Sequence, residues 1–468
     1  MDSAASMINF DSKIIDIDAI KKYNQESPRY TSYPPAPYFR QDFSYNSYIK
    51  EIFNTNQSND SDISFYFHIP FCDSLCFFCG CNMMVTHNRT RIYRYVQYLK
   101  KELKLLKPNV QKNRKIAQLH WGGGTPTSLT PDEIRELGDF LSGNFEFSSK
   151  VEKSCEIDPR ALTQNHLEAL RSIGFSRISM GVQDLDDQVQ RAVNRIQPEA
   201  LVLEVVEWIR KLCFKSLNVD LIYGLPFQTL KSFEKTIESI IAISPERVAI
   251  FNFAYVPWMK KHMQVIDGNT LPSPEEKLAI LEMCVTKLKQ AGYVYIGMDH
   301  FAKPSDDLAM ALREKKLHRN FQGYTTCGDM DLYAFGVTGI SQVGRVYAQN
   351  YKTEKEYFAA IDANQLPVEK GYKLTLDDEI RRYVILRLMC DFEIGYQEIE
   401  EKYNIRFKTY FQWGLEQLLE LERDQLVVLY SDRIMVTEKG RFLIRNIAMN
   451  FDGFIEKKQN YARYSKTI

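Results

Sequence analysis

The hydrophobic positions of the chain change their period repeatedly between residues 63 and 300. Short apolar or alternating runs, typical of strands, occupy Ile63–Ile69, Ile116–Trp121, Lys153–Ile157, Arg177–Val182, Ser216–Tyr223 and Val248–Phe253. Stretches with the period of a helix occupy Thr90–Leu106, Pro131–Leu141, Gln164–Ile173, Pro198–Leu212, Leu230–Ile243 and Pro274–Ala291. Six strand–helix alternations predict parallel βα units, so we expect an α/β fold, a partial barrel of six units.

Two details refine this pattern. Pro131, Pro198 and Pro274 stand where the first turn of a helix is expected, a position that tolerates a missing amide hydrogen. The run Tyr293–His300 is a candidate for one further strand that closes the barrel.

Both ends of the chain differ from this middle part. Residues 54–62 are polar and the preceding segment is rich in turn-forming residues. After about Leu374, helical patterns precede a short hairpin, an order that resembles a winged helix: Asp377–Cys390, Tyr396–Tyr403, Tyr410–Glu422, then Val427–Tyr430 with Ile434–Thr437. The helix that would read DNA is acid-rich, so we expect a lid or packing domain there.

These patterns divide the chain into four parts. We expect an N-terminal extension that gates the barrel over residues 1–62 and the barrel itself over residues 63–301. A barrel-closing and linker region follows over residues 302–373, and a mainly helical C-terminal domain over residues 374–468.

Composition narrows the class of protein. Lys+Arg and Asp+Glu both number 60, so no net field attracts nucleic acid or a membrane surface. No apolar run reaches the ~20 residues that span a bilayer, and the first 22 residues show no secretory signal. The cysteines outside one cluster are scattered, as in a reducing compartment, which predicts a cytoplasmic protein.

Four cysteines fall within ten residues, and three of them have the spacing C-x3-C-x2-C: Cys72, Cys76 and Cys79. Thiolates favour iron–sulfur clusters, zinc or copper. Three of them can hold three corners of a [4Fe–4S] cluster and leave one iron open to a non-protein ligand. A structural zinc site would need four ligands, and one C-x2-C pair is present. Cys81 either supports this site or serves packing alone.

Polar residues gather at the predicted strand ends, where α/β barrels carry their chemistry. Tyr66 and His68 share one face of the first strand, which runs into the cysteine loop. Gly122, Gly123 and Gly124 end the second strand and let a ligand approach the backbone. Further ends carry Glu156, Asp158, Gln183 and Asp220, and the buried carboxylates predict a cationic ligand such as an amine or sulfonium.

With these motifs in view, the chain resembles the radical S-adenosylmethionine (SAM) superfamily, and within it the oxygen-independent coproporphyrinogen III oxidases. The resemblance rests on runs from about residue 25 to the C-terminus: Pro28–Pro34, His68–Cys72, Phe78–Cys81, His120–Gly124, Ser179–Asp184, Asp220–Pro226, Gly297–Phe301 and His318–Thr326.

The resemblance implies that Cys72, Cys76 and Cys79 ligate the cluster and that SAM binds the open iron. It also implies two bound SAM molecules. Contacts to the first match Tyr66, Gly123, Glu156 and Ile340. Contacts to the second match Phe78, Gly124, Thr125, Gln183, Arg195, Asp220 and Ala254.

The implied reaction is oxidative decarboxylation of two propionates of coproporphyrinogen III to vinyl groups, giving protoporphyrinogen IX through a 5′-deoxyadenosyl radical. The substrate has four carboxylates, so a net-neutral enzyme needs local cations, and Arg29 and Arg319 are the candidates. The family also implies a monomer that receives electrons from a low-potential donor such as flavodoxin or ferredoxin.

Three alternatives stay open. Haem chaperones of the same superfamily typically lack the Cys81 equivalent and the Arg29–Pro34 segment, which this chain has. Radical SAM methyltransferases or haem-degrading relatives share two bound SAM molecules. A zinc-stabilised DNA-binding regulator would use the C-terminal winged helix.

Overall fold

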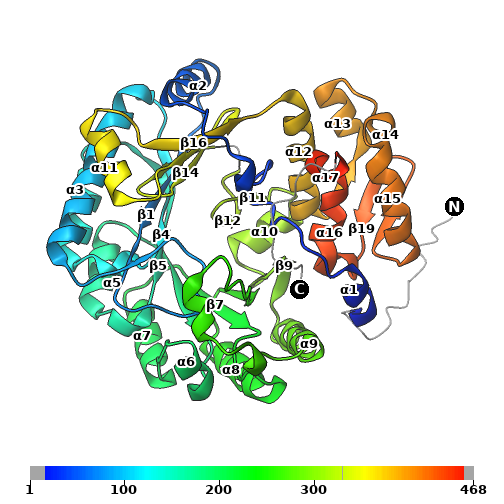
Figure 1. Cartoon of the computed structure of the whole chain (residues 1–468), viewed down its shortest axis with the longest axis horizontal. Coiled ribbons are helices and arrows are strands. Elements are labelled where there is room, and N and C mark those ends of the chain that lie inside the picture. Colours follow the sequence, from blue (N-terminus) through cyan, green and yellow to red (C-terminus); the bar gives the residue numbers. More distant parts are fainter. Residues whose placement is uncertain (1–15, 329, 458–468) are drawn as a thin grey trace.

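The computed structural model describes residues 16–328 and 330–457. Most of the first 22 residues, for which the sequence predicts no secretory signal, lie outside these ranges. Parallel strands form its centre: β13 (Asp331–Phe335), β1 (Ile63–Ile69), β4 (Ile116–Gly123), β5 (Phe147–Ile157), β6 (Arg177–Gln183), β7 (Ser216–Tyr223) and β8 (Arg247–Asn252). The six strands predicted from the sequence are all present, and β13 adds a seventh beside β1. The α/β fold is therefore confirmed (Figure 1).

Antiparallel strands extend this sheet at both edges: β14 (Ile340–Val343), β15 (Val346–Asn350), β16 (Val368–Lys373), β9 (Val294–Gly297) and β10 (His300–Ala302). The full order is β16-β15-β14-β13-β1-β4-β5-β6-β7-β8-β10-β9, a mixed twelve-stranded sheet. It is an open barrel whose first and last strands do not meet.

The predicted single strand over Tyr293–His300 is wrong in detail. Left-handed backbone at Gly297 (φ 143°) and Met298 (φ 52°) turns the chain there, so the segment splits into β9 and β10. β10 runs antiparallel to β8 and the pair ends the sheet. At the other edge, β13–β16 belong to the same sheet as β1, so the sheet continues across the predicted boundary at residue 301. The four-part division stays a prediction.

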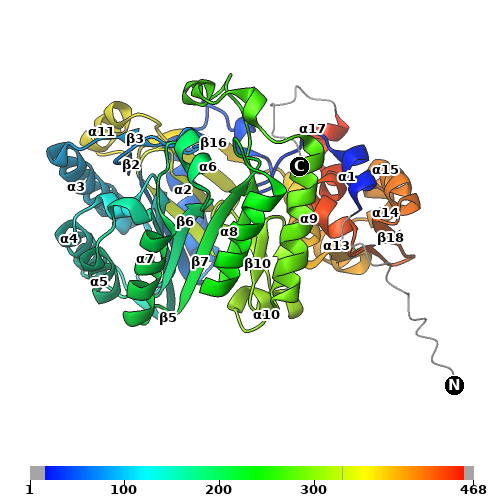
Figure 2. The same ribbon diagram turned by 90° about the horizontal axis from the view of Figure 1, so that it is seen from below.

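Helices cover the outer face of the sheet, as Figure 2 shows. They are α3 (Arg89–Leu106), α4 (Pro131–Ser142), α5 (Gln164–Ser172), α6 (Asp187–Ala192), α7 (Glu199–Lys211), α8 (Leu230–Ile243) and α9 (Pro274–Gln290). Thr130 caps α4 by a reciprocal capping box with Glu133. Pro131 and Pro274 open their helices as expected, but Pro198 precedes α7, because its extended ψ of 145° places it at the N-cap.

The core lies between these helices and the sheet. Phe65 and Phe67 on β1 are fully buried, and Trp121 on β4 packs edge-on against Phe175 with ring centroids 4.9 Å apart. A parallel strand with both faces covered needs apolar side chains on both, which explains the near-continuous apolar runs. Polar side chains within the strands, such as Ser64 and Gln118, are paired with each other, with the Ser64 hydroxyl donating to Gln118 at 2.9 Å.

The linker region adds α10 (Asp307–Arg313), β11 (His318–Asn320), β12 (Gly323–Thr325) and α11 (Glu354–Asp362). The C-terminal module contains α12 (Leu376–Asp391), β17 (Glu393–Gly395), α13 (Tyr396–Tyr403), α14 (Phe407–Tyr410), α15 (Gln412–Arg423), β18 (Val427–Leu429), β19 (Arg433–Val436), α16 (Ile444–Ala448) and α17 (Gly453–Glu456). Its three-stranded sheet has the order β17-β19-β18 and includes the predicted hairpin. Over the described ranges, no helix combines the length and apolarity needed to cross a membrane.

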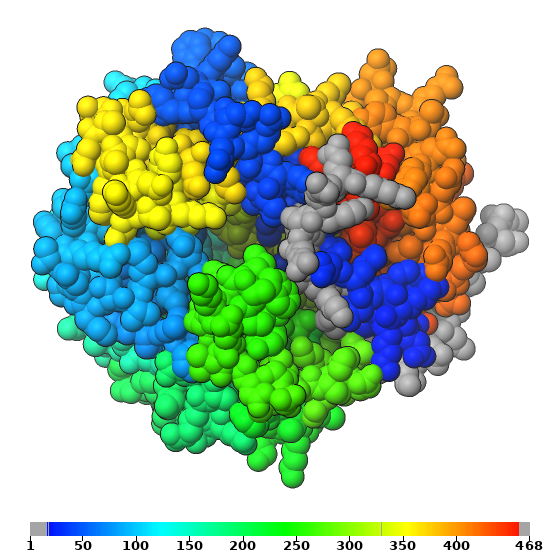
Figure 3. All heavy atoms as spheres, in the orientation of Figure 1, coloured from blue at the N-terminus to red at the C-terminus, as the bar shows by residue number. Residues whose placement is uncertain are grey.

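The N-terminal segment joins the barrel to this module. It contains α1 (Ile17–Tyr23) and α2 (Tyr45–Ser58), and we call residues 24–35 between them the strap. Figure 3 shows the segment in blue between the barrel and the orange-to-red C-terminal module. The Tyr30 hydroxyl donates to Asp452 at 3.0 Å, and the Gly453 amide donates to the Tyr33 hydroxyl at 2.9 Å. The C-terminal module therefore fixes the strap in place.

Candidate active site

The cysteine loop follows β1 and lies against the ends of the neighbouring strands. Cys72 ends a two-residue strand, β2 (Phe71–Cys72), which pairs with β3 (Met84–Val85). The Cys72 sulfur lies 3.6 Å from the Thr125 hydroxyl. The Cys76 sulfur accepts hydrogen bonds from Arg160 at 3.1 Å and Arg195 at 3.5 Å. Guanidinium groups beside a thiol stabilise its anionic, metal-binding form.

The donor set fits an iron–sulfur cluster. All three predicted cysteines line one cavity of about 350 Å³, which we call the cluster cavity. In residues 16–328 and 330–457, no three His, Cys, Asp or Glu side chains converge as they would on a single metal ion. A cluster of four irons spreads its ligands around a larger centre, and three thiols around a cavity provide that spread.

The thiols differ in acidity. Burial raises the pKa of Cys72 to about 11. Hydrogen bonding from Cys81 lowers the pKa of Cys79 to about 6, and the same interaction raises that of Cys81. The carbonyls of Cys79 and Cys81 accept from His262 at 2.8 Å and Lys260 at 3.1 Å. Cys81 therefore acts on the loop through Cys79.

Most predicted SAM contacts lie on the wall of the cluster cavity. Eight of the eleven line it: Phe78, Gly123, Gly124, Thr125, Glu156, Gln183, Arg195 and Asp220. Gln183 has left-handed backbone (φ 66°) at the end of β6, a conformation that non-glycine residues adopt mainly at constrained sites. The structure thus brings together residues from the ends of β4, β5, β6 and β7.

Tyr66, Ala254 and Ile340 are not on this wall. The Tyr66 hydroxyl lies 3.1 Å from His68 Nδ1, and His68 Nε2 lies 2.8 Å from the Asn82 carbonyl. Because a carbonyl only accepts, Nε2 carries the hydrogen and Nδ1 accepts from Tyr66. Ala254 lines a neighbouring cavity instead, and Ile340 packs beside a buried cluster of Phe39, Tyr347 and Leu374.

Glu156 is held as a carboxylate. Its Oε2 accepts from the Gly123 amide at 3.1 Å, and its Oε1 lies 3.3 Å from His120 Nε2. Burial would raise the pKa of Glu156, but these two donors outweigh it and lower the pKa below its usual value. The Glu156 side chain is 44% exposed and lines the cavity, so this anion can receive the ammonium group of an amino-acid ligand.

Glycine is required at Gly122, Gly123 and Gly124 by close contacts within the protein, apart from any contact with a ligand. A Cβ at Gly122 would come within 2.8 Å of the Glu156 carboxylate, and one at Gly124 within 2.6 Å of the Pro70 carbonyl. Gly123 has φ 118°, which other residues rarely adopt. The run lets the cysteine loop and Glu156 pack against the end of β4.

Asp158 is neutralised by the protein itself. It lies 2.6 Å from Arg160 and 3.0 Å from Arg195, although the sequence predicted a cationic ligand for it. Against the effect of burial, Arg195 and Arg160 lower the pKa of Asp158. Since the same two arginines reach Cys76, Asp158 orients the donors to that thiol. Arg160 and His120 have supporting roles that the sequence did not single out.

The pKa of Asp220 on β7 is raised, unlike those of Glu156 and Asp158, which are lowered. It accepts from Ser179 at 2.9 Å and Asn218 at 2.8 Å, and burial raises its pKa to about 6. A raised pKa in the folded state means that ionisation of Asp220 opposes folding. Its contribution to the free energy of unfolding is fully present below the usual pKa near 3.8 and is lost as the pH rises through about 6.

Asp220→Asn is therefore expected to stabilise the apo protein at pH 7 by roughly 2 kcal/mol. This gain in the free energy of unfolding should shrink as the pH falls from 6 to 4, because Asp220 becomes protonated and is then as neutral as the Asn that replaces it. Thermal unfolding of apo wild type and variant across this pH range measures the difference, with the exposed Asp139→Asn as control. A gap that does not depend on pH would contradict the explanation.

Arg29 and Arg319 lie together beyond the cluster cavity. Arg29 forms an ion pair with Asp299, and its guanidinium carbon is 5.9 Å from the ring centroid of Phe251, which lines the cluster cavity. Arg319 Nε donates to the Arg29 carbonyl at 3.4 Å. The Nη1 atom of Arg319 is buried and has no hydrogen-bond partner among the described residues.

Comparison with known proteins gives the same assignment along nearly the whole chain. The profile of the radical SAM superfamily matches residues 66–240, and that of the HemN C-terminal domain matches residues 374–443. The oxygen-independent coproporphyrinogen III oxidase of Synechocystis sp. is 46% identical over 96% of this chain and 97% of its own. That of Helicobacter pylori strain J99 is 44% identical over 97% and 99%.

A solved structure agrees with this. Coproporphyrinogen III oxidase (HemN) from Escherichia coli, described as a radical SAM enzyme, superposes with a TM-score of 0.90 at 43% identity. The match covers 94% of this chain and 99% of the E. coli chain. The cysteine loop, the strand-end cavity and these full-length similarities together show that the chain belongs to the oxygen-independent coproporphyrinogen III oxidase family.

Proposed function

We propose that the chain catalyses oxygen-independent oxidative decarboxylation of two propionates of coproporphyrinogen III to vinyl groups, which gives protoporphyrinogen IX for haem and porphyrin biosynthesis. The observation that carries this is the loop of Cys72, Cys76 and Cys79, which opens on the same cavity as Glu156 and the end of the glycine run. In a member of this family, that arrangement matches a radical SAM oxidoreductase.

The cofactors are a [4Fe–4S] cluster and SAM. When bound, they supply a one-electron cleavage that yields a carbon radical able to take a hydrogen atom from the substrate. Cys72, Cys76 and Cys79 would hold the cluster, and hydrogen bonds from Arg160 and Arg195 to Cys76 offset its negative charge.

Two SAM molecules are part of the proposal. The first would contact Tyr66, Gly123, Glu156 and Ile340, with the Glu156 carboxylate receiving its ammonium group. The second would contact Phe78, Gly124, Thr125, Gln183, Arg195, Asp220 and Ala254. The wall of the cluster cavity supports both sets except for Tyr66, Ala254 and Ile340, which do not line it. The Tyr66 ring stacks on His120 with centroids 5.8 Å apart, and Ala254 lines the neighbouring cavity.

Arg29 and Arg319 are proposed to bind carboxylates of the substrate. Their support is the closeness of Arg29 to Phe251 and the buried, unsatisfied Nη1 of Arg319, as far as residues 16–328 and 330–457 are concerned. We further propose that the chain works as a monomer in the cytoplasm and receives electrons from flavodoxin or ferredoxin.

An anaerobic assay with a reductant, SAM and coproporphyrinogen III tests the function. We expect two successive losses of CO2 by mass spectrometry, one for each propionate. SAM cleavage without any decarboxylated porphyrinogen would contradict the proposal and favour a haem chaperone or methyltransferase. A protein that binds neither iron nor sulfide would contradict the oxidase, the haem chaperone and the methyltransferase alike.

A further inference from the structure

The loop that follows β8 exposes apolar side chains beside the cysteine loop. Residues 256–266, which we call the basic loop, include a short 3-10 helix, η5 (Lys261–Val265). Trp258, Met259 and Val265 are 62%, 63% and 65% exposed, the highest values among the large hydrophobic residues that the structure describes. Figure 3 shows this loop in green on the face turned to the viewer. Single exposed apolar residues are ordinary, but such a group in one loop marks a contact surface.

The other side of the basic loop is fixed to the cysteine loop. Met263 and Ile266 are buried in a hydrophobic cluster, and Phe77 and Phe78 of the cysteine loop pack against this cluster. The basic loop is therefore apolar on both sides, and the protein itself covers one of them.

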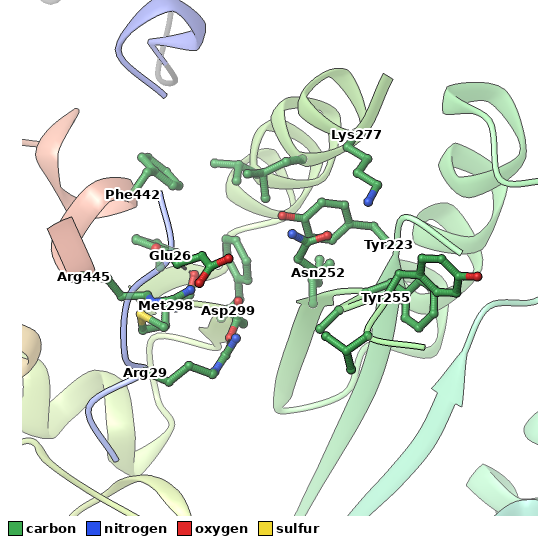
Figure 4. Close-up of a pocket in the computed structure, with 18 of the residues that line it drawn as sticks. Glu26, Arg29, Tyr223, Asn252, Tyr255, Lys277, Met298, Asp299, Phe442 and Arg445 are labelled. Carbon is green, nitrogen blue, oxygen red and sulfur yellow. Dashed lines mark hydrogen bonds and ion pairs between the residues drawn. The ribbon is translucent and has the colours of Figure 1, made fainter. Parts of the chain in front are cut away.

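The cavity beside the cluster cavity does not account for the exposed side. Figure 4 shows Tyr255 on the barrel side of that cavity, with its hydroxyl pointing away from the arginines on the opposite side. This hydroxyl donates to the Ile266 carbonyl at 3.1 Å and anchors the loop. Trp258 lines the same cavity, whereas Met259 and Val265 line neither it nor the cluster cavity. Their surface is directed to another molecule.

Hydrogen bonds join the basic loop to the backbone of the predicted cluster ligands. His262 Nε2 donates to the Cys79 carbonyl at 2.8 Å, and Lys260 Nζ donates to the Cys81 carbonyl at 3.1 Å. A molecule that contacts this loop is therefore one side chain away from the backbone of a cluster ligand.

The exposed side of the loop is also positively charged. Residues 253–266 include two lysines and a histidine but no Asp or Glu. Lys261 is exposed, Lys260 donates to a neutral carbonyl, and neither forms an ion pair within residues 16–328 and 330–457. Asp267 follows the loop and caps the next turn, and Asp73 of the cysteine loop lies 3.7 Å from a histidine. The charge of the two lysines is thus available to a partner.

These features indicate the chemistry of the partner. An apolar patch beside unpaired lysines is complementary to an acidic surface that has an apolar centre. Electron-transfer complexes have small interfaces, so the surface of one loop and its surroundings is large enough. A position bonded to the backbone of Cys79 and Cys81 suits a partner that exchanges electrons with the metal centre.

We propose that the basic loop is the docking surface of an acidic carrier protein that gives one electron to the cluster held by Cys72, Cys76 and Cys79. The reduced carrier, which has a flavin or an iron–sulfur centre, loses one electron and the cluster gains it, and no bond is made or broken. The inference rests on the proposed function, because that chemistry starts from a reduced cluster.

The test measures binding of oxidised flavodoxin to the full chain with its cluster, by anaerobic calorimetry at about 20 mM ionic strength. Lys261→Glu should weaken binding about 10-fold, and the difference should shrink at about 150 mM, where charges are screened more strongly. The double variant Met259→Ser, Val265→Ser should weaken binding about 10-fold at both ionic strengths, because the loss is of apolar contact.

Two matched controls lie elsewhere on the surface. Lys150→Glu changes the net charge equally near the N-terminal end of β5, whereas the cysteine loop lies at the carboxyl ends of the strands. Phe53→Ser removes an apolar side chain of α2 that is 61% exposed. Both should bind flavodoxin with wild-type affinity.

A second readout separates docking from damage to the cluster. Reduced flavodoxin should reduce the cluster about 10-fold more slowly in the basic-loop variants, because less of the complex forms. Dithionite, a small reductant that needs no docking, should reduce it at the wild-type rate. SAM affinity and iron content should not change.

Wild-type affinity for flavodoxin in both basic-loop variants would overturn the inference, as would a wild type that binds neither flavodoxin nor a ferredoxin. Variants that lose affinity for SAM or coproporphyrin III but not for the carrier would overturn it as well, and would show that the loop is a lid. Binding and reduction are measured without turnover. An enzyme that passes these tests but does not decarboxylate coproporphyrinogen III would contradict the proposed function and not the docking surface.

Discussion

Cys76→Ser is expected to remove the iron–sulfur absorption and to lower SAM cleavage by more than about 100-fold. Replacing a residue that supports a metal ligand already costs about 10- to 100-fold, and loss of a ligand itself costs more. Cys76 is the thiol that both Arg160 and Arg195 contact, so its replacement would also remove a shared sulfur acceptor of these two guanidinium groups. Iron and sulfide analysis of the anaerobically reconstituted protein measures the effect.

Two further serine variants make this result specific. Cys81→Ser should retain the cluster, because Cys81 acts through its hydrogen bond to Cys79 and the fourth iron would be left to SAM. Cys213→Ser removes an exposed thiol after α7 and should change nothing. A Cys81 variant without iron, beside a Cys76 variant with a full cluster, would mean that the ligands are assigned wrongly.

The barrel could be predicted from the sequence because its strands are buried on both faces. Ile63–Ile69 and Ser216–Tyr223 were predicted with the bounds that the structure has. Parallel strands bring their carboxyl ends to one edge, so residues such as Glu156 and Asp220, 64 positions apart by number, could be placed in one cavity before any coordinates were known.

The parts that could not be predicted depend on pairing between distant segments. β13 lies beside β1, although 261 residues separate the ends of these strands, Ile69 and Asp331, in sequence. Arg445 reaches the strap across more than 400 residues, and no periodicity signals such a contact. Asp158 was expected to meet a ligand because nothing local identifies Arg195 as its partner.

These long-range contacts share a purpose in the site. Arg195, Arg160 and Asp158 place two cations and a carboxylate at a thiol, whereas Arg445 and Arg319 stand near Arg29, which is itself paired with Asp299. The first arrangement offsets the charge of a resident metal cluster.

Glu156→Gln is expected to weaken SAM binding about 10- to 100-fold while the cluster stays intact. Glu156 is held ionised by the Gly123 amide and His120, so it offers a full negative charge to an ammonium group. The amide of Gln keeps the shape but has no charge, and a charge-assisted hydrogen bond is worth about 1.5 to 3 kcal/mol. Equilibrium binding of SAM to the reconstituted, unreduced enzyme gives the affinity.

The matched control is Glu152→Gln, a partly exposed position on the same strand that pairs with Arg177 at 2.9 Å outside the cluster cavity. SAM affinity should remain at the wild-type value there. Because His120 and the Gly123 amide hold the pKa of Glu156 below its usual value, the ionised carboxylate stabilises the folded state at neutral pH, and the Gln variant should unfold at a somewhat lower temperature than wild type. A Gln variant that keeps wild-type SAM affinity would show that the ammonium group is bound elsewhere on the cavity wall.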